Sequence, residues 1–352
     1  MSTFKKIFAF SVTTAIILTL SMASQAQTEK QFQMALVGFY NLENLFDTID
    51  DPNKRDEEFL PDGQNRWNTE KYMTKLANMS EVISQIGRDD DPDGLAVLGI
   101  SEIENRQVIE DLINTPLLKP MGFKIIHYDS PDKRGVDVGM IYRPKYLEVT
   151  NTKSYRLTIP GMDHFYTRDQ LVVSGKLLGD DIHFIVNHWP SRRGGEKASR
   201  PLRNAAAALS RHIVDSLLAL NPQAKIIVMG DLNDQPTNES VLKIMNAKGN
   251  KDKLKDGEFY NPMYKLYKQG IGSGAWRDTW SLFDQTLLSQ GLLGKDYSTY
   301  KYYGVRIFNK SFLKQKEGRY KGYPYRTFAG GTWMGGYSDH FPVYVILIRE
   351  VK

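Results

Sequence analysis

Eight short apolar runs, spaced along almost the whole chain, constrain its fold more than any other feature of the sequence. They span residues 34–41, 94–102, 137–144, 171–178, 182–189, 225–233, 282–289 and 341–348. Each run has the length and the aliphatic, β-branched composition of a strand. Helical spacing of apolar residues appears between some of them, over 69–87 and over 199–219. Strands interleaved with a few helices predict an α/β or α+β domain in which helices cover the faces of sheets.

Polar side chains gather where several of these runs begin or end. They are Asn41, Glu43, Glu102, Asn187, His188, Asp231, Asn233, Asp339 and His340. A buried acid or amide costs free energy unless it is paired or bound to a metal ion. Because so many strands end in such residues, we expect these ends to converge on one site.

The first residues have the layout of a secretory signal peptide. Two lysines precede an apolar stretch, and the small-residue exit "ASQAQ" follows at residues 23–27. We therefore expect residues 1–26 to be a cleaved signal peptide, with an uncleaved membrane anchor as the alternative. The serine and threonines that interrupt the stretch, and its short length, favour cleavage. The mature protein, residues 27–352, would be secreted or periplasmic and would have no stable insertion in a membrane.

The mature chain has no cysteine and only a weak positive charge. Without cysteine it has no disulfide, so its core, or in part a metal ion, must hold it together. Removal of residues 1–26 removes two lysines and no acids, and the formal net charge falls from +5 to +3. This charge is compatible with a polyanionic substrate but does not argue for one. No Pro- or Gly-rich linker divides residues 27–352, which predicts a single domain. We expect a monomer.

Taken singly, the candidate residues have simpler explanations. Glu102 suits a helix N-terminus, "GDLND" suits a turn, and a lone histidine such as His188 is more often a core residue. The order and spacing of the motifs carry more weight. They are "FYNLENLFD" (39–47), "ISEIEN" (100–105), "RGVDVGMIYRP" (134–144), "NHWPSR" (187–192), "GDLND" (230–234), "FDQTLLS" (283–289) and "SDHFPV" (338–343).

Together these motifs resemble the endonuclease/exonuclease/phosphatase superfamily over essentially the whole mature chain. The resemblance implies a two-sheet β-sandwich flanked by helices, in four α/β/β/α layers. It also implies a divalent-metal site for cleavage of phosphate esters at one end of the sheets. Hydrolysis of such an ester needs an attacking water, neutralisation of the phosphoryl charge and help for the leaving alkoxide. Oxygen ligands favour Mg²⁺, with Mn²⁺ or Ca²⁺ as alternatives, over zinc.

The resemblance implies a role for each residue at the strand ends. The metal ligands would be Glu102 and Asn41, with Glu43 and Asp339 beside them. Asp231 and Asn233 would orient and activate the attacking water. His340 would hydrogen-bond the scissile phosphate as an imidazolium, and Asp284 would hold its ring. His188 would be a general acid or a phosphate contact, and Asp137 would be its partner.

Further residues are candidates for contact with the substrate. They are Arg134, Asp137, Asn187, Arg192, Arg193 and Arg203, and the three arginines after His188 could grip phosphates as bidentate donors. The alternative for those arginines is a solvated loop that leads into a helix. The segment 301–326 combines eight Lys or Arg with five tyrosines and a single acid, Glu317. This mixture suits a polynucleotide, and the alternative is an ordinary surface meander.

We predict a secreted nuclease that requires a divalent metal ion, with nucleic acid as its substrate and DNA favoured over RNA. A phosphatase or a phospholipase-type phosphodiesterase is the first alternative, because the metal residues do not choose the ester. A binding protein that keeps the fold without activity is the second alternative. The intact Glu102, Asp231, Asn233, Asp339 and His340 argue against it.

Overall fold

Two large sheets form the middle of the molecule in a computed structural model that describes residues 30–351. The first has the strand order β14-β17-β1-β2-β4-β3 and the second β5-β6-β7-β8-β13-β10-β9. The strands of the first sheet are β1 Phe32–Leu45, β2 Leu95–Ile103, β3 Lys124–His127, β4 Asp137–Tyr142, β14 Lys301–Ile307 and β17 Val343–Glu350. Those of the second are β5 Leu147–Tyr155, β6 Gln170–Leu177, β7 Asp180–His188, β8 Ile226–Asp231, β9 Ala247–Lys248, β10 Phe259–Tyr260 and β13 Asp284–Leu288.

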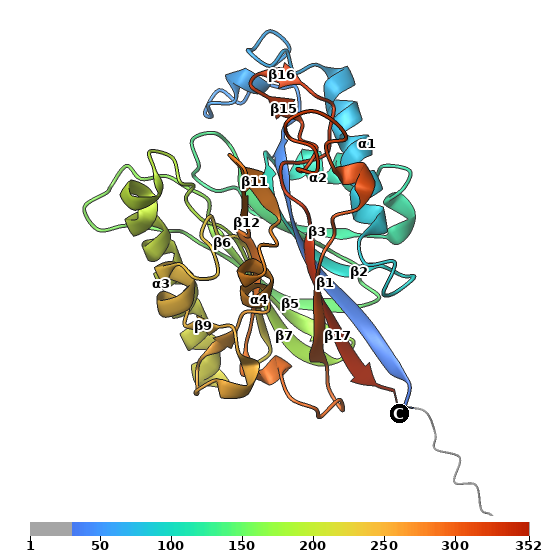
Figure 1. Cartoon of the computed structure of the whole chain (residues 1–352), viewed down its shortest axis with the longest axis vertical. Coiled ribbons are helices and arrows are strands. Elements are labelled where there is room, and N and C mark those ends of the chain that lie inside the picture. The colour runs from blue at the N-terminus through green and yellow to red at the C-terminus, as the bar shows by residue number, and fades with distance from the viewer. Residues whose placement is uncertain (1–29, 352) are drawn as a thin grey trace, which may run out of the picture.

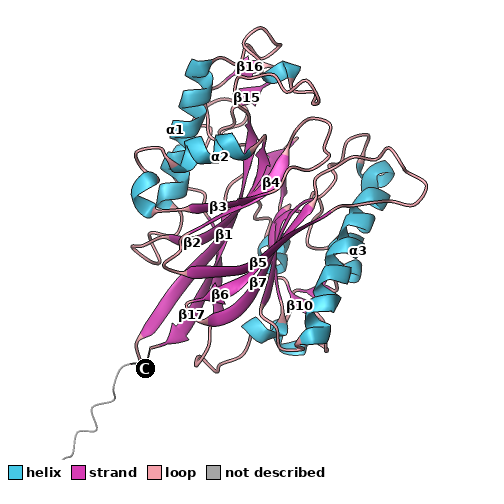
Figure 2. Cartoon of the chain, turned by 180° about the vertical axis from the view of Figure 1, so that it is seen from behind, coloured by secondary structure: helices cyan, strands magenta, loops and turns pink. Residues whose placement is uncertain are grey.

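Helices cover the outer face of each sheet, as Figure 2 shows from behind. The helices are α1 Thr69–Gln85, α2 Arg106–Ile113, α3 Glu196–Leu220 and the short α4 Met263–Lys268. Short 3₁₀ turns span Glu57–Phe59, Lys119–Met121, Lys251–Lys253, Gln290–Leu292 and Ser311–Leu313, and a π-helical turn spans Ser240–Ile244. The predicted helices at 69–87 and 199–219 correspond to α1 and α3, although α3 begins earlier than its apolar spacing indicated.

Three apolar clusters separate the layers. One lies between the sheets and joins Val37 and Phe39 of β1 to Phe184 of β7. A second packs the other face of β1 against α1 and α2, and a third packs the outer face of β7 and β8 against α3. Successive residues of a strand point to opposite faces, so a strand covered on both sides reads as a continuous apolar run. The predicted four-layer α/β/β/α sandwich is confirmed.

Strand direction brings the polar strand ends together. β1 pairs in parallel with β2, and β7 pairs in parallel with β8, so each pair ends at the same edge of its sheet. β17 and β13 run antiparallel to these strands and begin where the others end. Two hairpins stand at this same end, which lies away from the C-terminus in Figure 1. They are β11 Gly274–Trp276 with β12 Thr279–Ser281, and β15 Phe328–Ala329 with β16 Thr332–Trp333.

The predicted signal peptide, residues 1–26, lies outside the described residues and stays a prediction. Within residues 30–351, no helix combines the length and the apolar character that a membrane crossing requires.

Candidate active site

Asp231, the last residue of β8, lies at the centre of the polar cluster. Its Oδ2 accepts a hydrogen bond from Asn41 Nδ2 at 3.1 Å. His188 Nε2 lies 3.7 Å from the same oxygen and 3.7 Å from Glu102 Oε1. His340 Nε2 lies 3.9 Å from Asp231 Oδ2. Residues that are almost 300 positions apart in the sequence therefore surround one carboxylate.

Local backbone distortion turns several of these side chains toward the cluster. Glu102 lies where the register of β2 shifts against both neighbouring strands, and its φ is +58°. Asn233 has a φ of +49°, and the adjacent Glu43 and Asn44 have φ values of +50° and +55°. A bulge or a left-handed residue breaks strict strand alternation and redirects a side chain, at a cost that such sites commonly carry. Alternation alone would not have indicated where Glu102 points.

His340 is held by a carboxylate and is charged. Its Nδ1 donates to Asp284 Oδ2 at 2.7 Å, and its backbone N–H donates to Ser338 Oγ at 3.1 Å. Burial would lower the pKa of His340, but the carboxylates of Asp284, Asp339 and Asp231 outweigh it and hold the pKa well above the usual value. His340 is therefore an imidazolium at neutral pH, and its Nε2–H faces Asp231 and Asp339.

His188 is more buried than His340, and it has no carboxylate partner on its other nitrogen. Among the described residues, no group hydrogen-bonds its Nδ1. Burial, followed by the nearby guanidinium groups of Arg168 and Arg134 and then the charge of His340, holds the pKa of His188 well below the usual value. Arg168 Nε also donates to the His188 carbonyl oxygen at 3.1 Å. His188 is therefore a neutral imidazole.

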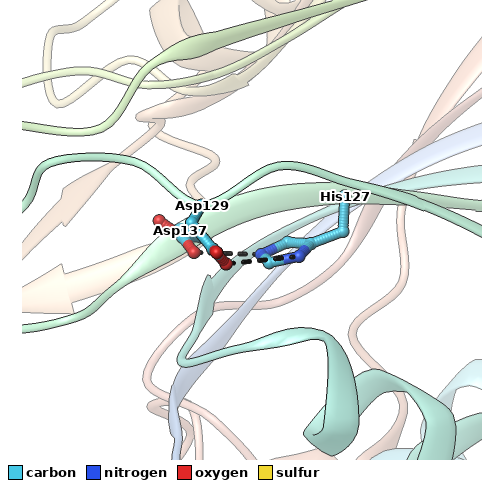
Figure 3. A group of neighbouring side chains, drawn as sticks. All are labelled: His127, Asp129 and Asp137. Carbon is cyan, nitrogen blue, oxygen red and sulfur yellow. Dashed lines mark hydrogen bonds and ion pairs between the residues drawn. The ribbon is translucent and has the colours of Figure 1, made fainter. Parts of the chain in front are cut away.

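Asp137 does not serve as the partner of His188, which corrects the prediction from sequence. Its Oδ2 lies 2.9 Å from His127 Nε2, as Figure 3 shows. Its Oδ1 accepts a hydrogen bond from the Ser130 N–H. Asp129 lies 3.9 Å from His127 Nδ1 but is exposed to solvent. The carboxylate of Asp137 is thus already satisfied within its own loop.

Glu43 also lies differently from the prediction. Its Oε2 accepts from the Thr327 N–H at 2.6 Å and its Oε1 from Arg326 Nε at 3.3 Å. Arg326 Nη2 donates in turn to Asp339 Oδ2 at 2.7 Å. Burial and the Asp339 charge raise the pKa of Glu43 to about 7, against the opposing effect of Lys75 and Arg326. Glu43 therefore holds Arg326 and is no longer among the metal ligands that we propose.

Sequence reasoning missed Lys75 and the role of Arg326. Lys75 is fully buried on α1, and its Nζ donates to Thr327 Oγ1 at 2.7 Å. Burial lowers the pKa of Lys75 to about 8, although the neighbouring carboxylates oppose this shift. Nothing in the apolar spacing of α1 marks Lys75, whereas Arg326 was visible only as one cation of a basic segment.

Several predicted substrate contacts lie elsewhere. Asn187 is fully buried, and its Oδ1 accepts from Trp189 Nε1 and Ser210 Oγ, toward α3. Arg203 is fully buried and pairs with Asp234 at 2.7 Å, and Arg192 pairs with the same carboxylate at 2.9 Å. These three residues support the second sheet and α3. We remove them from the proposed substrate contacts.

The roles predicted for Asn233, Arg134 and Arg193 stay predictions. Asn233 accompanies Asp231, because its N–H donates to Asp231 Oδ1 at 2.9 Å. Arg134 is partly exposed and pairs with Asp132, and its charge acts on His188. Arg193 is exposed on the loop before α3.

The residues fit a divalent cation. Glu102 Oε1 lies 3.7 Å from His188 Nε2, Asp339 Oδ1 lies 3.8 Å from His340 Nε2, and Asn41 donates to Asp231. The carboxylate and amide oxygens of Glu102, Asp339 and Asn41 are of the kind that Mg²⁺, Mn²⁺ and Ca²⁺ prefer. Burial raises the pKa of Asp231 to about 7, and Asp284 and Glu102 add to the rise while His340 opposes it. Several buried carboxylates this close together favour the binding of a cation. Carboxylates with strongly shifted pKa values are typical of functional sites.

The basic segment 301–326 divides into two parts. Its first part forms β14, an edge strand that pairs with β17 and ends at Ile307, opposite Val343. Lys310 pairs with Asp89 on the side of the first sheet. Its last part returns to the cluster, where Arg326 joins Glu43 and Asp339. Only this last part lies beside the candidate site.

The chain is similar to known proteins over most of its length. A model described as Endonuclease/Exonuclease/phosphatase family matches residues 36–349. An endonuclease/exonuclease/phosphatase family protein from Bacteroides thetaiotaomicron is 16% identical, with a TM-score of 0.54 over 92% of this chain and 100% of that chain. A search of the curated proteins found no match.

Two further solved structures share the fold. A mannosyl-6-phosphatase from Bacteroides thetaiotaomicron VPI-5482 is 16% identical, with a TM-score of 0.53 over 89% of this chain and 99% of that chain. TDP2 from D. rerio, in complex with a single-strand DNA product, is 12% identical, with a TM-score of 0.52 over 89% of this chain and 98% of that chain. At such identities the likeness concerns the fold alone.

Proposed function

This chain belongs to the Endonuclease/Exonuclease/phosphatase family, and we propose that it is a nuclease that hydrolyses phosphodiesters with the help of a divalent cation. Family membership supports a phosphoric ester hydrolase. The observation that carries the proposal is the environment of Asp231, which lies between a charged histidine and a neutral one. This arrangement supplies a proton acceptor, a cation for the phosphoryl oxygens and a neutral hydrogen-bonding group at one place.

Each residue then has a chemical task. Glu102, Asp339 and Asn41 would hold the metal ion, which when bound supplies positive charge for the phosphoryl oxygens and makes water more acidic. The Asp231 carboxylate accepts a proton from the attacking water, while Asn41 fixes its orientation.

The two histidines act on the phosphate. The His340 Nε2–H donates to a phosphoryl oxygen, and Asp284 keeps the ring charged and oriented. A neutral imidazole with a low pKa is a poor general acid. We therefore assign His188 to hydrogen bonding with the phosphate.

Nucleic acid is the proposed substrate because arginine and tyrosine side chains of the last part of segment 301–326 lie beside Asp339. A TDP2 structure of the same fold was solved with a single-strand DNA product. DNA stays our first choice over RNA. We further propose export directed by residues 1–26, action as a monomer in the periplasm or outside the cell, and Mg²⁺ or Mn²⁺ as the cation.

A phosphatase that acts on a small phosphate ester is the second candidate. One observation favours it, because Arg192 and Arg203 are turned toward Asp234 and do not line a surface for a long polyanion. A mannosyl-6-phosphatase shares the fold.

A substrate panel tests the proposal. The purified protein would be incubated with single-stranded DNA, duplex DNA, RNA, mannose 6-phosphate and methyl p-nitrophenyl phosphate, each with Mg²⁺, Mn²⁺ or chelator. We expect metal-dependent cleavage of the polynucleotides and the diester. Release of phosphate from mannose 6-phosphate alone would replace the nuclease with the phosphatase.

A further inference from the structure

A cavity of about 600 Å³ opens beside Asp339, outside the cluster around Asp231. The β11–β12 hairpin contributes Trp276 and Arg277 to its lining, and the 315–326 loop contributes Arg319, Tyr320 and Arg326. Ala329 and Gly330 of the β15–β16 hairpin close another side. Figure 1 shows both hairpins at the same end of the sandwich. Of its lining residues, only Asp339 has a task in the hydrolysis described above.

The walls of the cavity are hydrogen-bonded to the segment that carries Asp339 and His340. Gly274 of β11 forms a bridge with His340, and the Phe341 N–H donates to the Ser273 oxygen at 2.7 Å. On the other side, Arg326 Nη2 donates to Asp339 Oδ2 at 2.7 Å. A substrate whose phosphate contacts His340 can therefore extend past Asp339 into the cavity, because these hydrogen bonds hold the cavity walls next to His340.

The tip of the β11–β12 hairpin is held in an unusual conformation. Arg277 and Asp278 have φ values of +46° and +62°, although the two-residue turn they form favours Asn or Gly. Asp278 accepts a hydrogen bond from the Tyr323 hydroxyl at 3.0 Å and lies 3.6 Å from Arg319. These contacts join the hairpin to the 315–326 loop and fix the two walls relative to each other.

The lining combines exposed aromatic rings with guanidinium groups. Trp276 is 66% exposed and Tyr320 is 51% exposed, which is high for such large apolar side chains. Three arginines line the cavity, and its one acid, Asp339, is already paired with Arg326. Rings with a free face stack on planar groups, and guanidinium groups bind phosphate. A ligand that presents a planar ring and a phosphate close together would satisfy both.

We propose that this cavity binds one unpaired nucleotide of the substrate, with its base against Trp276 and Tyr320 and its phosphate near Arg319. The inference rests on the proposed function and adds to it a preference for single-stranded nucleic acid, because a paired base has no free face to offer. The cavity would then select the nucleotide next to the one whose phosphate is cleaved.

Binding in the presence of EDTA tests the cavity without cleavage. Anisotropy of a fluorescein-labelled oligothymidylate of ten nucleotides would be compared with that of a duplex of equal length. We expect Trp276→Ala to weaken single-strand binding about tenfold, since stacking contributes that much per base. Trp276→Phe should restore most of the loss. Arg319→Gln should weaken binding and lower the salt slope by about 0.7, the value for one phosphate contact on a single strand. Tyr303→Ala, an equally exposed ring on β14 outside the cavity, is the matched control.

Hydrolysis separates the two proposals. The ratio of kcat/KM for the 5′-p-nitrophenyl ester of the dinucleotide pTpT, which carries a neighbouring nucleotide, to that for thymidine 5′-(p-nitrophenyl phosphate), which carries none, should exceed one in the parent and fall toward one in Trp276→Ala. If the parent hydrolyses neither diester nor any polynucleotide, the nuclease proposal fails and the binding data alone decide the role of the cavity. If the parent binds the single strand no better than the duplex, or if Trp276→Ala and Arg319→Gln bind it as the parent does, the cavity inference is overturned while hydrolysis stands.

Discussion

His340 and His188 face the same oxygen of Asp231 at 3.9 and 3.7 Å, yet their pKa values are shifted in opposite directions. His340 has Asp284 on its second nitrogen and Asp339 nearby, so its pKa is raised. His188 is buried near Arg168, and its second nitrogen has no hydrogen-bond partner within residues 30–351, so its pKa is lowered. The group on the far side of each ring decides which chemistry the ring can perform.

A third histidine shows that a carboxylate partner alone does not make a site. His127 pairs with Asp137 at 2.9 Å, much as His340 pairs with Asp284 at 2.7 Å. The Asp137 carboxylate is also satisfied by Ser130, whereas the His340 ring turns its free nitrogen toward Asp231. What distinguishes His340 is that the acid facing its second nitrogen, Asp231, is buried, whereas Asp129, which lies equally far from the second nitrogen of His127, is exposed to solvent.

The largest expected effect is on kcat/KM, and it separates His340→Ala from His188→Ala. His340→Ala should lower kcat/KM for a phosphodiester by on the order of 10² to 10³, since it removes the charge that stabilises the phosphoryl oxygens. His188→Ala should lower it about tenfold, because a neutral hydrogen-bonding group is lost. Steady-state rates with thymidine 5′-(p-nitrophenyl phosphate) and circular dichroism of each variant would measure this. Equal losses would remove the distinction between the two rings.

The next effect concerns Asp284, which we describe as a positioning residue for His340. Asp284→Asn should lower kcat/KM by about tenfold to 10²-fold, because the ring loses both its orientation and its charge. In a His340→Ala background the same change should add little, since residues that act as a unit are not additive. A double-mutant cycle measures the coupling. Independent, additive losses would show that Asp284 supports the fold and not His340.

The charge states themselves give the third prediction. The His340 pKa is raised, so its stabilising contribution is fully present below the unfolded value near 6.5 and is lost as pH rises through the folded value. His188 should stay neutral through this range. NMR titration of the ring protons, with His340→Ala and His188→Ala for assignment, would record a charged ring and a neutral ring together at pH 7. Two rings that titrate together near 6.5 would contradict the electrostatic account.

The smallest effect concerns Glu104, a buried acid whose charged neighbours are Asp47, Asp56 and Asp51. Burial raises its pKa from 4.5 to about 8, against the hydrogen bond from the Asp47 N–H. The folded state therefore holds a proton that the unfolded state releases, and stability falls as pH rises from 4.5 to 8. Glu104→Gln keeps the uncharged form. It should stabilise the protein at pH 8.5 relative to pH 5 by on the order of 1 kcal/mol.

Thermal unfolding at the two pH values measures this effect. Glu196→Gln is the control, because Glu196 is a more exposed acid whose pKa is lowered by the hydrogen bond from Arg200. That variant should lose a little stability at high pH. An equal response of both variants would show that burial does not govern Glu104.

The strand pattern predicted an α/β or α+β domain and the convergence of polar strand ends on one site, whereas the two-sheet, four-layer sandwich was implied by the resemblance of the motifs to the family. Buried strands read as apolar runs, and polar residues at their ends marked Asn41, Glu102, Asp231 and His340. The same reasoning could have excluded Asn187. It precedes His188 on β7, and neighbouring residues on a strand point to opposite faces.

Other parts of the site depend on tertiary contacts that leave no local signal. Arg326 and Glu43 meet across 283 positions of sequence, and Lys75 reaches the loop at Thr327 from an ordinary amphipathic helix. The bulge at Glu102 arises where β2 shifts its register against both β1 and β4, so it depends on two neighbouring strands and not on the local sequence. Arg203 was wrongly predicted for a related reason. The sequence suggests an exposed arginine, but its ion pair with Asp234 holds it in the interior.

The central claim is that the strand-end acids bind a divalent cation and that phosphodiester hydrolysis requires it. Hydrolysis of thymidine 5′-(p-nitrophenyl phosphate) would be followed while Mn²⁺ is titrated into metal-free parent protein, Glu102→Gln and the control Glu110→Gln, whose glutamate lies on α2 and pairs with Arg106. The account predicts no turnover in chelator, saturable activation of the parent and of Glu110→Gln, and a much weaker response to Mn²⁺ in Glu102→Gln. Undiminished turnover in chelator, with metal content verified as nil, would contradict it.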